Sequence, residues 1–88
     1  MSVTIKLSPT FHQYADNRET VEVEGTTVRA CLDSLIARLP VFKDLVSDSD
    51  HPLSVLIIYD GEVIVPSGLD RPVKDRSEIS LMPMIYGG

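Results

Sequence analysis

The chain has 88 residues and a formal net charge of -5 at pH 7, from thirteen acidic and eight basic side chains. This length suits one domain with a small core, which we expect to span residues 1–88. The charge balance excludes nucleic acid as a main partner, because phosphate binding needs clustered lysine and arginine, and an acidic surface is repelled by anionic membranes.

Two strands and a helix are predicted in the first half of the chain. Apolar and polar residues alternate over 3–7 and over 20–24, which is typical of half-buried strands. The polar segment between them predicts a loop. A helix follows, capped by Thr26 or Thr27 and stopped by Pro40. Its apolar face, at helical spacing, carries Val28, Leu32, Leu35, Ile36 and Leu39.

The second half predicts three more strands. One further helical turn at 41–46 and a solvated loop precede the apolar run "VLIIY", which is a strand too short to cross a membrane. Asp60-Gly61 is a hairpin signal, and a short strand returns over 63–65. After a long connection without a period, a last strand begins near Ile79, and Pro83 prevents it from continuing as a paired central strand. The order predicts an α+β fold with one helix on one face of a mixed sheet of four or five strands.

Side chains suited to catalysis or metal binding form no convincing arrangement. Cys31, the only cysteine, lies beside the apolar face of the helix and is expected to be a buried, inert thiol. His12 and His51 lie in predicted loops and are expected to be exposed. The spacing of Asp48, Asp50 and His51 matches no metal loop. We therefore expect no active site, no bound metal or cofactor and, without a signal peptide, a cytoplasmic location.

The chain ends in "SLMPMIYGG", in which two glycines closely follow the last strand. We expect residues 85–88 to leave the sheet as a flexible tail. A terminal carboxylate becomes reactive when it attacks the α-phosphate of ATP, which forms an acyl-adenylate and releases pyrophosphate. A sulfur donor or an amine can then displace AMP. Glycine lacks a Cβ atom, so two terminal glycines fit the narrow channel that such an activating enzyme needs.

Three stretches resemble the ubiquitin-like sulfur carriers, which include the molybdopterin synthase small subunit and the thiamine-pathway sulfur carrier. They are "YADNRETVEVEGTTVRACLDSLIARLPVF", "IIYDGEVI" and "GLDRPVKDRSEISLMPMIYGG". The resemblance implies a β-grasp fold in which the first and last strands are adjacent and parallel. The residues that match the family pattern near the end are Leu69, Asp70, Pro72, Val73, Lys74, Asp75, Pro83, Gly87 and Gly88.

The same resemblance implies the function of a protein co-substrate rather than an enzyme. Gly88 would be adenylated by an activating enzyme that uses ATP and then converted to a thiocarboxylate, with Gly87 as the channel residue. The further partners would be a sulfur donor and an acceptor enzyme or the catalytic subunit of a molybdopterin-synthase-like enzyme. Molybdenum or tungsten pterin synthesis is the leading pathway. The expected partner-binding residues are Val63, Met82, Pro83, Met84, Ile85 and Tyr86.

The chain departs from the family pattern in three places. Arg76 and Ser77 stand where glycine and aspartate are common, so we expect the turn there to differ in shape. Met84 replaces a second proline and Tyr86 a smaller residue, which points to a dedicated partner in a specialised pathway. Two alternatives stay open: a modifier joined to lysines through Gly88, and a non-covalent β-grasp binding module.

Overall fold

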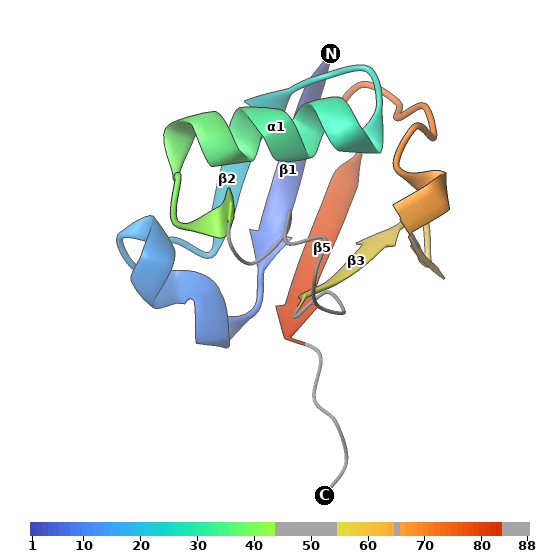
Figure 1. Ribbon diagram of the computed structural model, residues 1–88. Helices are drawn as coiled ribbons and strands as arrows, with labels where there is room; N and C mark the ends of the chain where they lie inside the picture. The colour runs from blue at the N-terminus through green and yellow to red at the C-terminus, as the bar shows by residue number, and fades with distance from the viewer. Residues whose placement is uncertain (44–54, 65, 84–88) are drawn as a thin grey trace, which may run out of the picture.

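The computed structural model describes residues 1–43, 55–64 and 66–83 (Figure 1). The predicted order of strands and main helix is confirmed, and two 3-10 helices are added to it. In chain order the elements are β1 (Ser2–Leu7), η1 (Pro9–Ala15), β2 (Thr20–Glu24), α1 (Val28–Arg38), β3 (Val55–Tyr59), β4 (Glu62–Val63), η2 (Pro66–Gly68) and β5 (Glu78–Pro83).

The five strands form one mixed sheet in the order β2-β1-β5-β3-β4. β1 pairs antiparallel with β2 and parallel with β5, so the first and last strands lie side by side. β3 pairs antiparallel with β5 and with β4. This is the β-grasp topology that the resemblance implied, and it makes β5 the central strand.

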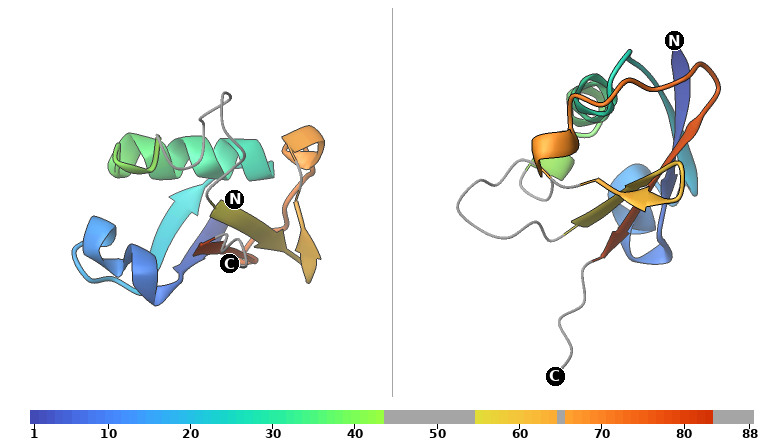
Figure 2. Two further views of the ribbon diagram at one scale, coloured as in Figure 1. Left: turned by 60° about the horizontal axis from the view of Figure 1, so that its bottom comes forward. Right: turned by 90° about the vertical axis from the view of Figure 1, so that its right-hand side faces the viewer.

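Helix α1 covers one face of the sheet, as the two views in Figure 2 show. The alternation in β1 and β2 follows from this layering, because Val3, Ile5 and Leu7 point toward α1 and are buried, as are Val21 and Val23. No described helix packs on the opposite face, which we call the outer face. It carries the even-numbered side chains of β1, β2, β3 and β5.

The predicted helical face is confirmed, with Cys31 as an addition to it. Val28, Leu32 and Leu35 are buried, and the helix margin is partly buried. The Thr27 hydroxyl accepts a hydrogen bond from the amide of Ala30 (3.1 Å), so of the two candidate caps Thr27 is the one used. No helix among the described residues is both long and apolar enough to cross a membrane.

Gly25, just before the helix, is required by a close approach of two backbone segments. A Cβ atom at this position would lie 2.7 Å from the amide nitrogen of Cys31 and 2.9 Å from the carbonyl carbon of Ala30. Neither backbone atom can move without disturbing the first turn of α1. The glycine therefore lets the chain turn tightly from β2 into the helix.

The segment between β1 and β2 was expected to be a loop, and that prediction is wrong, because it contains η1. Pro9 favours the helix start, since its φ is fixed and no amide is needed there. Phe11 is buried, and its ring meets that of Phe42 edge-on, with 6.0 Å between centroids. Asp16 ends the element in the left-handed region at φ 54°.

A short turn follows α1, beyond the stop at Pro40. The amides of Phe42 and Lys43 donate to the carbonyls of Leu39 and Pro40, each at 3.0 Å. Phe42 is fully buried beneath this turn. The turn predicted at 41–46 is thus confirmed as far as Lys43, and its remainder and the loop predicted after it lie outside the described residues.

The predicted hairpin between β3 and β4 is confirmed. Asp60 and Gly61 have φ values of 54° and 77°, the two positive values that a type I′ turn requires. β4 comprises Glu62 and Val63, so it is shorter than the strand expected at 63–65. The chain then enters η2, which begins at the proline expected to stop the strand.

The long connection from η2 to β5 has no periodicity because its backbone is held by the start of α1. The amides of Val28 and Arg29 donate to the carbonyls of Arg71 and Leu69, at 3.0 and 2.7 Å. These are two of the amides that a helix N-terminus leaves without intrahelical partners. Each segment therefore satisfies the other, and β5 starts from a fixed point.

Candidate functional site at the end of β5

The C-terminal segment continues from the end of β5, in the middle of the sheet. Pairing with β1 ends at Leu81, as expected, but pairing with β3 reaches Val55↔Pro83, so the prediction that Pro83 is unpaired is wrong on that side. In a parallel ladder the missing amide of Pro83 would face the carbonyl of Ser8. That carbonyl accepts from the amide of Phe11 instead (2.8 Å). Proline is therefore tolerated because β1 has already turned into η1.

Five of the predicted site residues follow Pro83 and lie outside the described residues. Their proposed roles, and the flexible tail at 85–88, stay predictions. What the structure does establish is the starting point of this segment at one end of the central strand. The five residues are Met84, Ile85, Tyr86, Gly87 and Gly88.

Two of the predicted contact residues that precede Pro83, Val63 and Met82, are both exposed on the outer face, at 56% and 44%. Met82 therefore does not pack in the core. Met82 lies opposite Leu56, and Val63 lies opposite Ile58, so the two half-buried β3 side chains join the two exposed ones. We call these four residues the apolar patch. The apolar patch lies next to the end of β5, from which the C-terminal segment continues.

Leu56 and Ile58 were not among the predicted contact residues, because the run "VLIIY" was interpreted only as a continuous apolar strand, without assigning its side chains to the two faces. In the structure Ile57 and Tyr59 face the core while Leu56 and Ile58 face outward. The available signal was the single predicted helix, which can cover only one face of a sheet. Alternation must then hold in β3 even though its sequence is uniformly apolar.

A groove of about 260 Å³ lies beside the apolar patch, between the ends of β1 and β5. Residues 6–9 form one wall, and residues 80–82 form the other. The Lys6 side chain is exposed there, and most of the remaining lining is apolar. The groove extends the apolar surface to the point where the C-terminal segment starts.

The turn that leads into β5, at the opposite end of the strand, contains Arg76. Arg76 adopts φ 62°, a left-handed conformation that costs a residue with a side chain about 1–2 kcal/mol. The turn is held nonetheless, because the Arg76 amide donates to the Ser2 carbonyl (2.6 Å) and the Ser2 amide donates to the Asp75 carboxylate (2.8 Å). The positive φ that glycine would supply is thus present without glycine.

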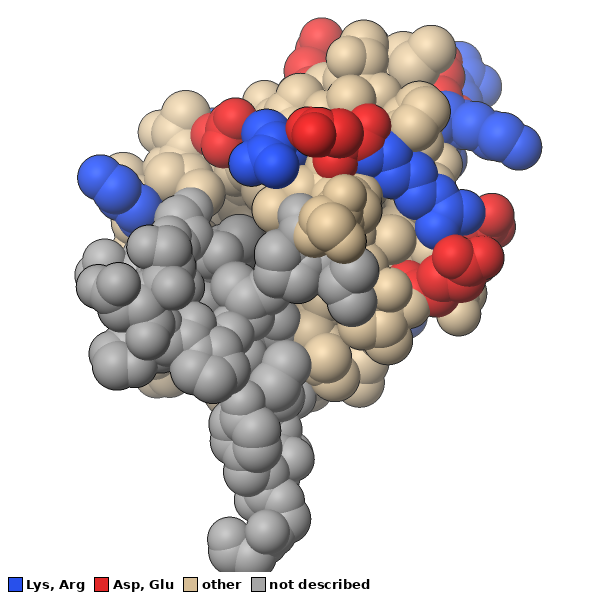
Figure 3. Space-filling view, turned by 45° about the vertical axis from the view of Figure 1, so that its right-hand side comes forward, with Lys and Arg blue, Asp and Glu red and all other residues tan. Residues whose placement is uncertain are grey.

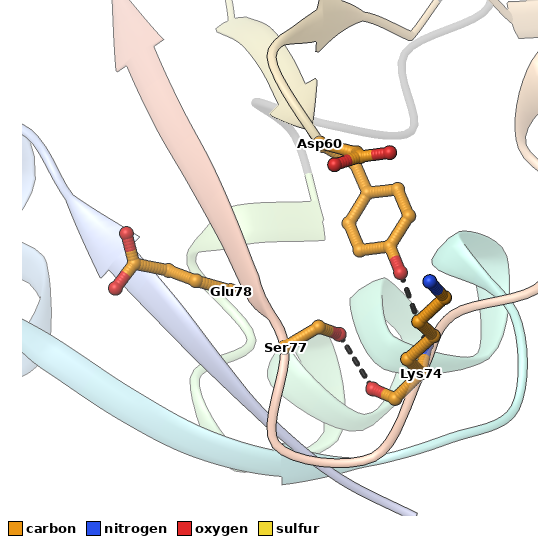
Figure 4. A pocket seen from close by; sticks show the side chains of 5 residues that line it. Asp60, Lys74, Ser77 and Glu78 are labelled. Carbon is orange, nitrogen blue, oxygen red and sulfur yellow. Dashed lines mark hydrogen bonds between the residues drawn. The ribbon is translucent and has the colours of Figure 1, made fainter.

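A second pocket, of about 290 Å³, lies beside this turn (Figure 4). The Tyr59 hydroxyl accepts from the Lys74 amide at 3.0 Å, and the Ser77 hydroxyl donates to the Lys74 carbonyl at 2.6 Å. In Figure 4 the Glu78 side chain points away from Lys74 and Ser77. These polar groups hold the turn and show no arrangement of a nucleophile with a base.

Several acidic and basic side chains lie next to one another on the face shown in Figure 3. Arg29 contacts Asp70 at 2.9 Å, and Arg71 contacts Glu62 at 2.8 Å and Asp60 at 3.8 Å. All of these groups are partly or largely exposed, so each pair contributes only about 0–1 kcal/mol. Their role is to tie the connection before β5 to α1 and to the β3–β4 hairpin.

The remaining candidates for chemistry are inert where the structure describes them. Burial raises the pKa of the Cys31 thiol, against a smaller lowering by the N-terminal ammonium. His12 was expected on an exposed loop but lies half-buried on η1, where its Nε2 bonds to the Leu7 carbonyl at 3.0 Å. Among the described residues no cluster of three metal-ligating side chains occurs. Asp48, Asp50 and His51 lie outside them.

Comparisons with known proteins agree with this geometry. The model of the ThiS family matches residues 5–88. A search of curated proteins found no significant match. A chain of the Amycolatopsis orientalis BexX/CysO complex superposes with a TM-score of 0.82 at 22% identity, covering 98% of this chain and 99% of that one.

Two further structures are somewhat more similar in sequence. SAMP1 from Haloferax volcanii has a TM-score of 0.80 and 26% identity, with 100% of both chains covered. The putative molybdopterin converting factor subunit 1 from Pyrococcus furiosus has a TM-score of 0.77 and 25% identity, covering 97% of this chain and 99% of that one. Both alignments span nearly the whole of each chain.

Proposed function

Because the chain belongs to the ThiS family of ubiquitin-like sulfur carriers, we propose that it carries sulfur as a thiocarboxylate on Gly88. The observation that carries this proposal is the family match over residues 5–88, which includes the two glycines. The described fold supports it, since the central strand runs toward them. The protein then acts as a co-substrate of other enzymes rather than as a catalyst.

The proposed chemistry has two steps, both at the carboxyl group of Gly88. One carboxylate oxygen attacks the α-phosphorus of ATP, the bond to pyrophosphate breaks, and an acyl-adenylate forms. A hydrosulfide sulfur then attacks the carbonyl carbon, the bond to the phosphate oxygen breaks, AMP leaves with that oxygen, and a thiocarboxylate remains. ATP is bound by the activating enzyme, so this chain needs no cofactor of its own. Gly87 lets the backbone enter the channel without a side chain.

The apolar patch supports a docking role in the same reaction. Val63 and Met82 are more than two-fifths exposed, and the patch lies on the face beside the end of β5. Exposed apolar groups that gather on one face mark an interaction surface. We assign Val63, Met82 and the backbone at Pro83 to contacts with the activating enzyme. Ile85, Tyr86 and Met84 would line the entrance to its channel.

Molybdenum or tungsten pterin synthesis is the pathway that we favour for the donated sulfur. The Pyrococcus furiosus relative is described as a putative molybdopterin converting factor subunit, at 25% identity. The acceptor would then be a synthase catalytic subunit. The Amycolatopsis orientalis neighbour comes from a complex with BexX, which supports a stable acceptor complex for a carrier of this fold. Tyr86 beside the glycines favours a dedicated partner.

Intact-mass spectrometry tests the proposal directly. The protein is incubated with ATP, a sulfur donor and the activating enzyme of the same genome. We expect the mass gain of one oxygen replaced by sulfur, located at Gly88 by peptide fragmentation. A variant that lacks Gly88 is the matched control and should gain nothing. A wild-type chain that ends at Gly88 and is never adenylated would contradict the proposal.

A second candidate function is protein modification through the same carboxyl group. SAMP1, a small archaeal modifier protein, aligns over 100% of both chains at 26% identity, which favours this alternative. Here a lysine amine attacks the acyl-adenylate and AMP leaves. Cells that express a tagged chain should then show covalent ladders on an anti-tag blot, absent without Gly88. If deletion of Gly88 left the cellular function intact, a non-covalent binding module would be favoured over both.

A further inference from the structure

The strand register arranges the outer-face side chains in rows across the sheet. Thr4 of β1 lies between Glu22 of β2 and Glu78 of β5, and Ser2 lies opposite Glu24 in the neighbouring row. All three glutamates are exposed. We call the three residues Glu22, Glu24 and Glu78 together the acidic row, although they occupy two adjacent rows of the sheet. It occupies the end of the face where β1 and β5 begin.

The opposite end of the same face is apolar. Met82 lies four residues beyond Glu78 along β5, a distance of about 13 Å at the rise of a strand. The apolar patch surrounds it, and the C-terminal segment starts there. Lys6, in the row between, is the only cationic side chain at the outward positions of the described strands. The face therefore grades from acidic to apolar toward the proposed reacting group.

The acidic row is not used by the fold in the part of the chain that the structure describes. No described cation lies within ion-pair distance of these three carboxylates, whereas Asp60, Glu62 and Asp70 are paired with Arg71 or Arg29. Arg38 reaches the backbone carbonyl of Glu22 and not its carboxylate. Glu22 and Glu78, two strands apart, repel each other weakly across about 10 Å.

Resting on the proposed function, we propose that the outer face docks the activating enzyme through two complementary zones. One zone of the enzyme is apolar and covers the apolar patch. The other carries basic side chains and faces the acidic row. Charge complementarity steers association and fixes the relative orientation of two proteins. Here it would turn the end of β5, and with it Gly88, toward the adenylation channel.

The test compares two triple variants with the same change of net charge. Glu22→Gln, Glu24→Gln and Glu78→Gln together neutralise the acidic row. Asp16→Asn, Glu19→Gln and Asp33→Asn neutralise exposed acids that lie off the outer face. Carrier-dependent ATP–pyrophosphate exchange by the activating enzyme gives kcat and KM at about 0.1 M and about 1 M salt, where the Debye length falls from about 10 to about 3 Å. Thermal unfolding shows that both variants are folded.

We expect the acidic-row variant to lower kcat/KM about tenfold at the lower salt concentration, through KM, with kcat unchanged. The control variant should change kcat/KM less than about twofold, and the difference should vanish at the higher salt concentration. Equal effects of the two variants, or no effect of either, would overturn the inference while the sulfur-carrier proposal stands. No exchange with the wild-type chain would overturn both.

Discussion

The two faces of the sheet are built by the same strands and differ in almost every property. On the inner face Val3, Ile5 and Leu7 are buried beneath α1. Between them on β1, Thr4 and Lys6 point to the outer face, where the acidic row and the apolar patch lie. A shift of one residue along a strand therefore separates positions that stabilise the fold from positions that a partner can contact.

The largest expected effect lies on the inner side. Leu35→Ala removes a fully buried side chain of α1 and should lower the free energy of unfolding by about 2–5 kcal/mol. Ile36→Ala is the matched control, because Ile36 is only partly buried at the helix margin and should cost clearly less. Denaturant unfolding measures both. Equal losses at the two positions would show that burial does not distinguish them.

The outer face should behave in the opposite way. Val63→Thr combined with Met82→Ser should change the free energy of unfolding by no more than about 0.5 kcal/mol, because both side chains are exposed. The same variant should lower kcat/KM for adenylation about tenfold, as loss of central contacts does at interfaces. Val41→Thr, at a comparably exposed site away from the sheet, is the control and should leave adenylation unchanged. Unchanged adenylation in the double variant would remove the apolar patch from the docking surface.

A smaller effect is expected at the turn that sets the register of β5, and thus which side chains reach each face. Arg76→Gly should raise the free energy of unfolding by about 0.5–1 kcal/mol, because the relief of a left-handed φ exceeds the added entropy of the unfolded glycine. Arg18→Gly, at an exposed position without a positive φ, should not stabilise. Thermal unfolding of the pair compares them, and a destabilised Arg76→Gly would mean that its side chain holds the turn.

The smallest expected effect concerns pH and the inner face. Burial raises the pKa of the Cys31 thiol, so on titration with base the unfolded chain loses this proton first. Stability is then unaffected well below the ordinary cysteine pKa and falls as the pH rises through and above it. Cys31→Ala should remove this slope, whatever its effect at neutral pH. If stability still fell with rising pH in the variant, the pH dependence would come from a group other than Cys31.

Local patterns were sufficient for most of the fold. Alternation located β1 and β2, helical spacing located α1, and Asp60-Gly61 located the hairpin. The 3-10 helix η1 was not found, because its stability depends on Phe11 meeting Phe42, about thirty residues away in the sequence. Two aromatic residues, Phe11 and Tyr14, stand among polar neighbours without periodicity, so their contacts with Phe42 cannot be predicted from their own segment.

The candidate site was predicted in part for the same reason. Exposure of Val63 and Met82 was anticipated, but their connection through Leu56 and Ile58 was not. The run that contains these two residues is uniformly apolar, so its own sequence does not indicate which side chains face outward. The sheet decides this, since it is covered by a helix on one face only.

By itself the sequence determined the helix, the strands, the turn residues and the pair of glycines, because each depends on neighbours a few positions away. Only the tertiary structure decided that β5 is the central strand and that Glu22, Thr4 and Glu78 share one row of the outer face. These three residues come from three strands, and their alignment depends on hydrogen bonds between distant segments. The charge gradient that points to the end of β5 is therefore a property of the register, which no local segment encodes.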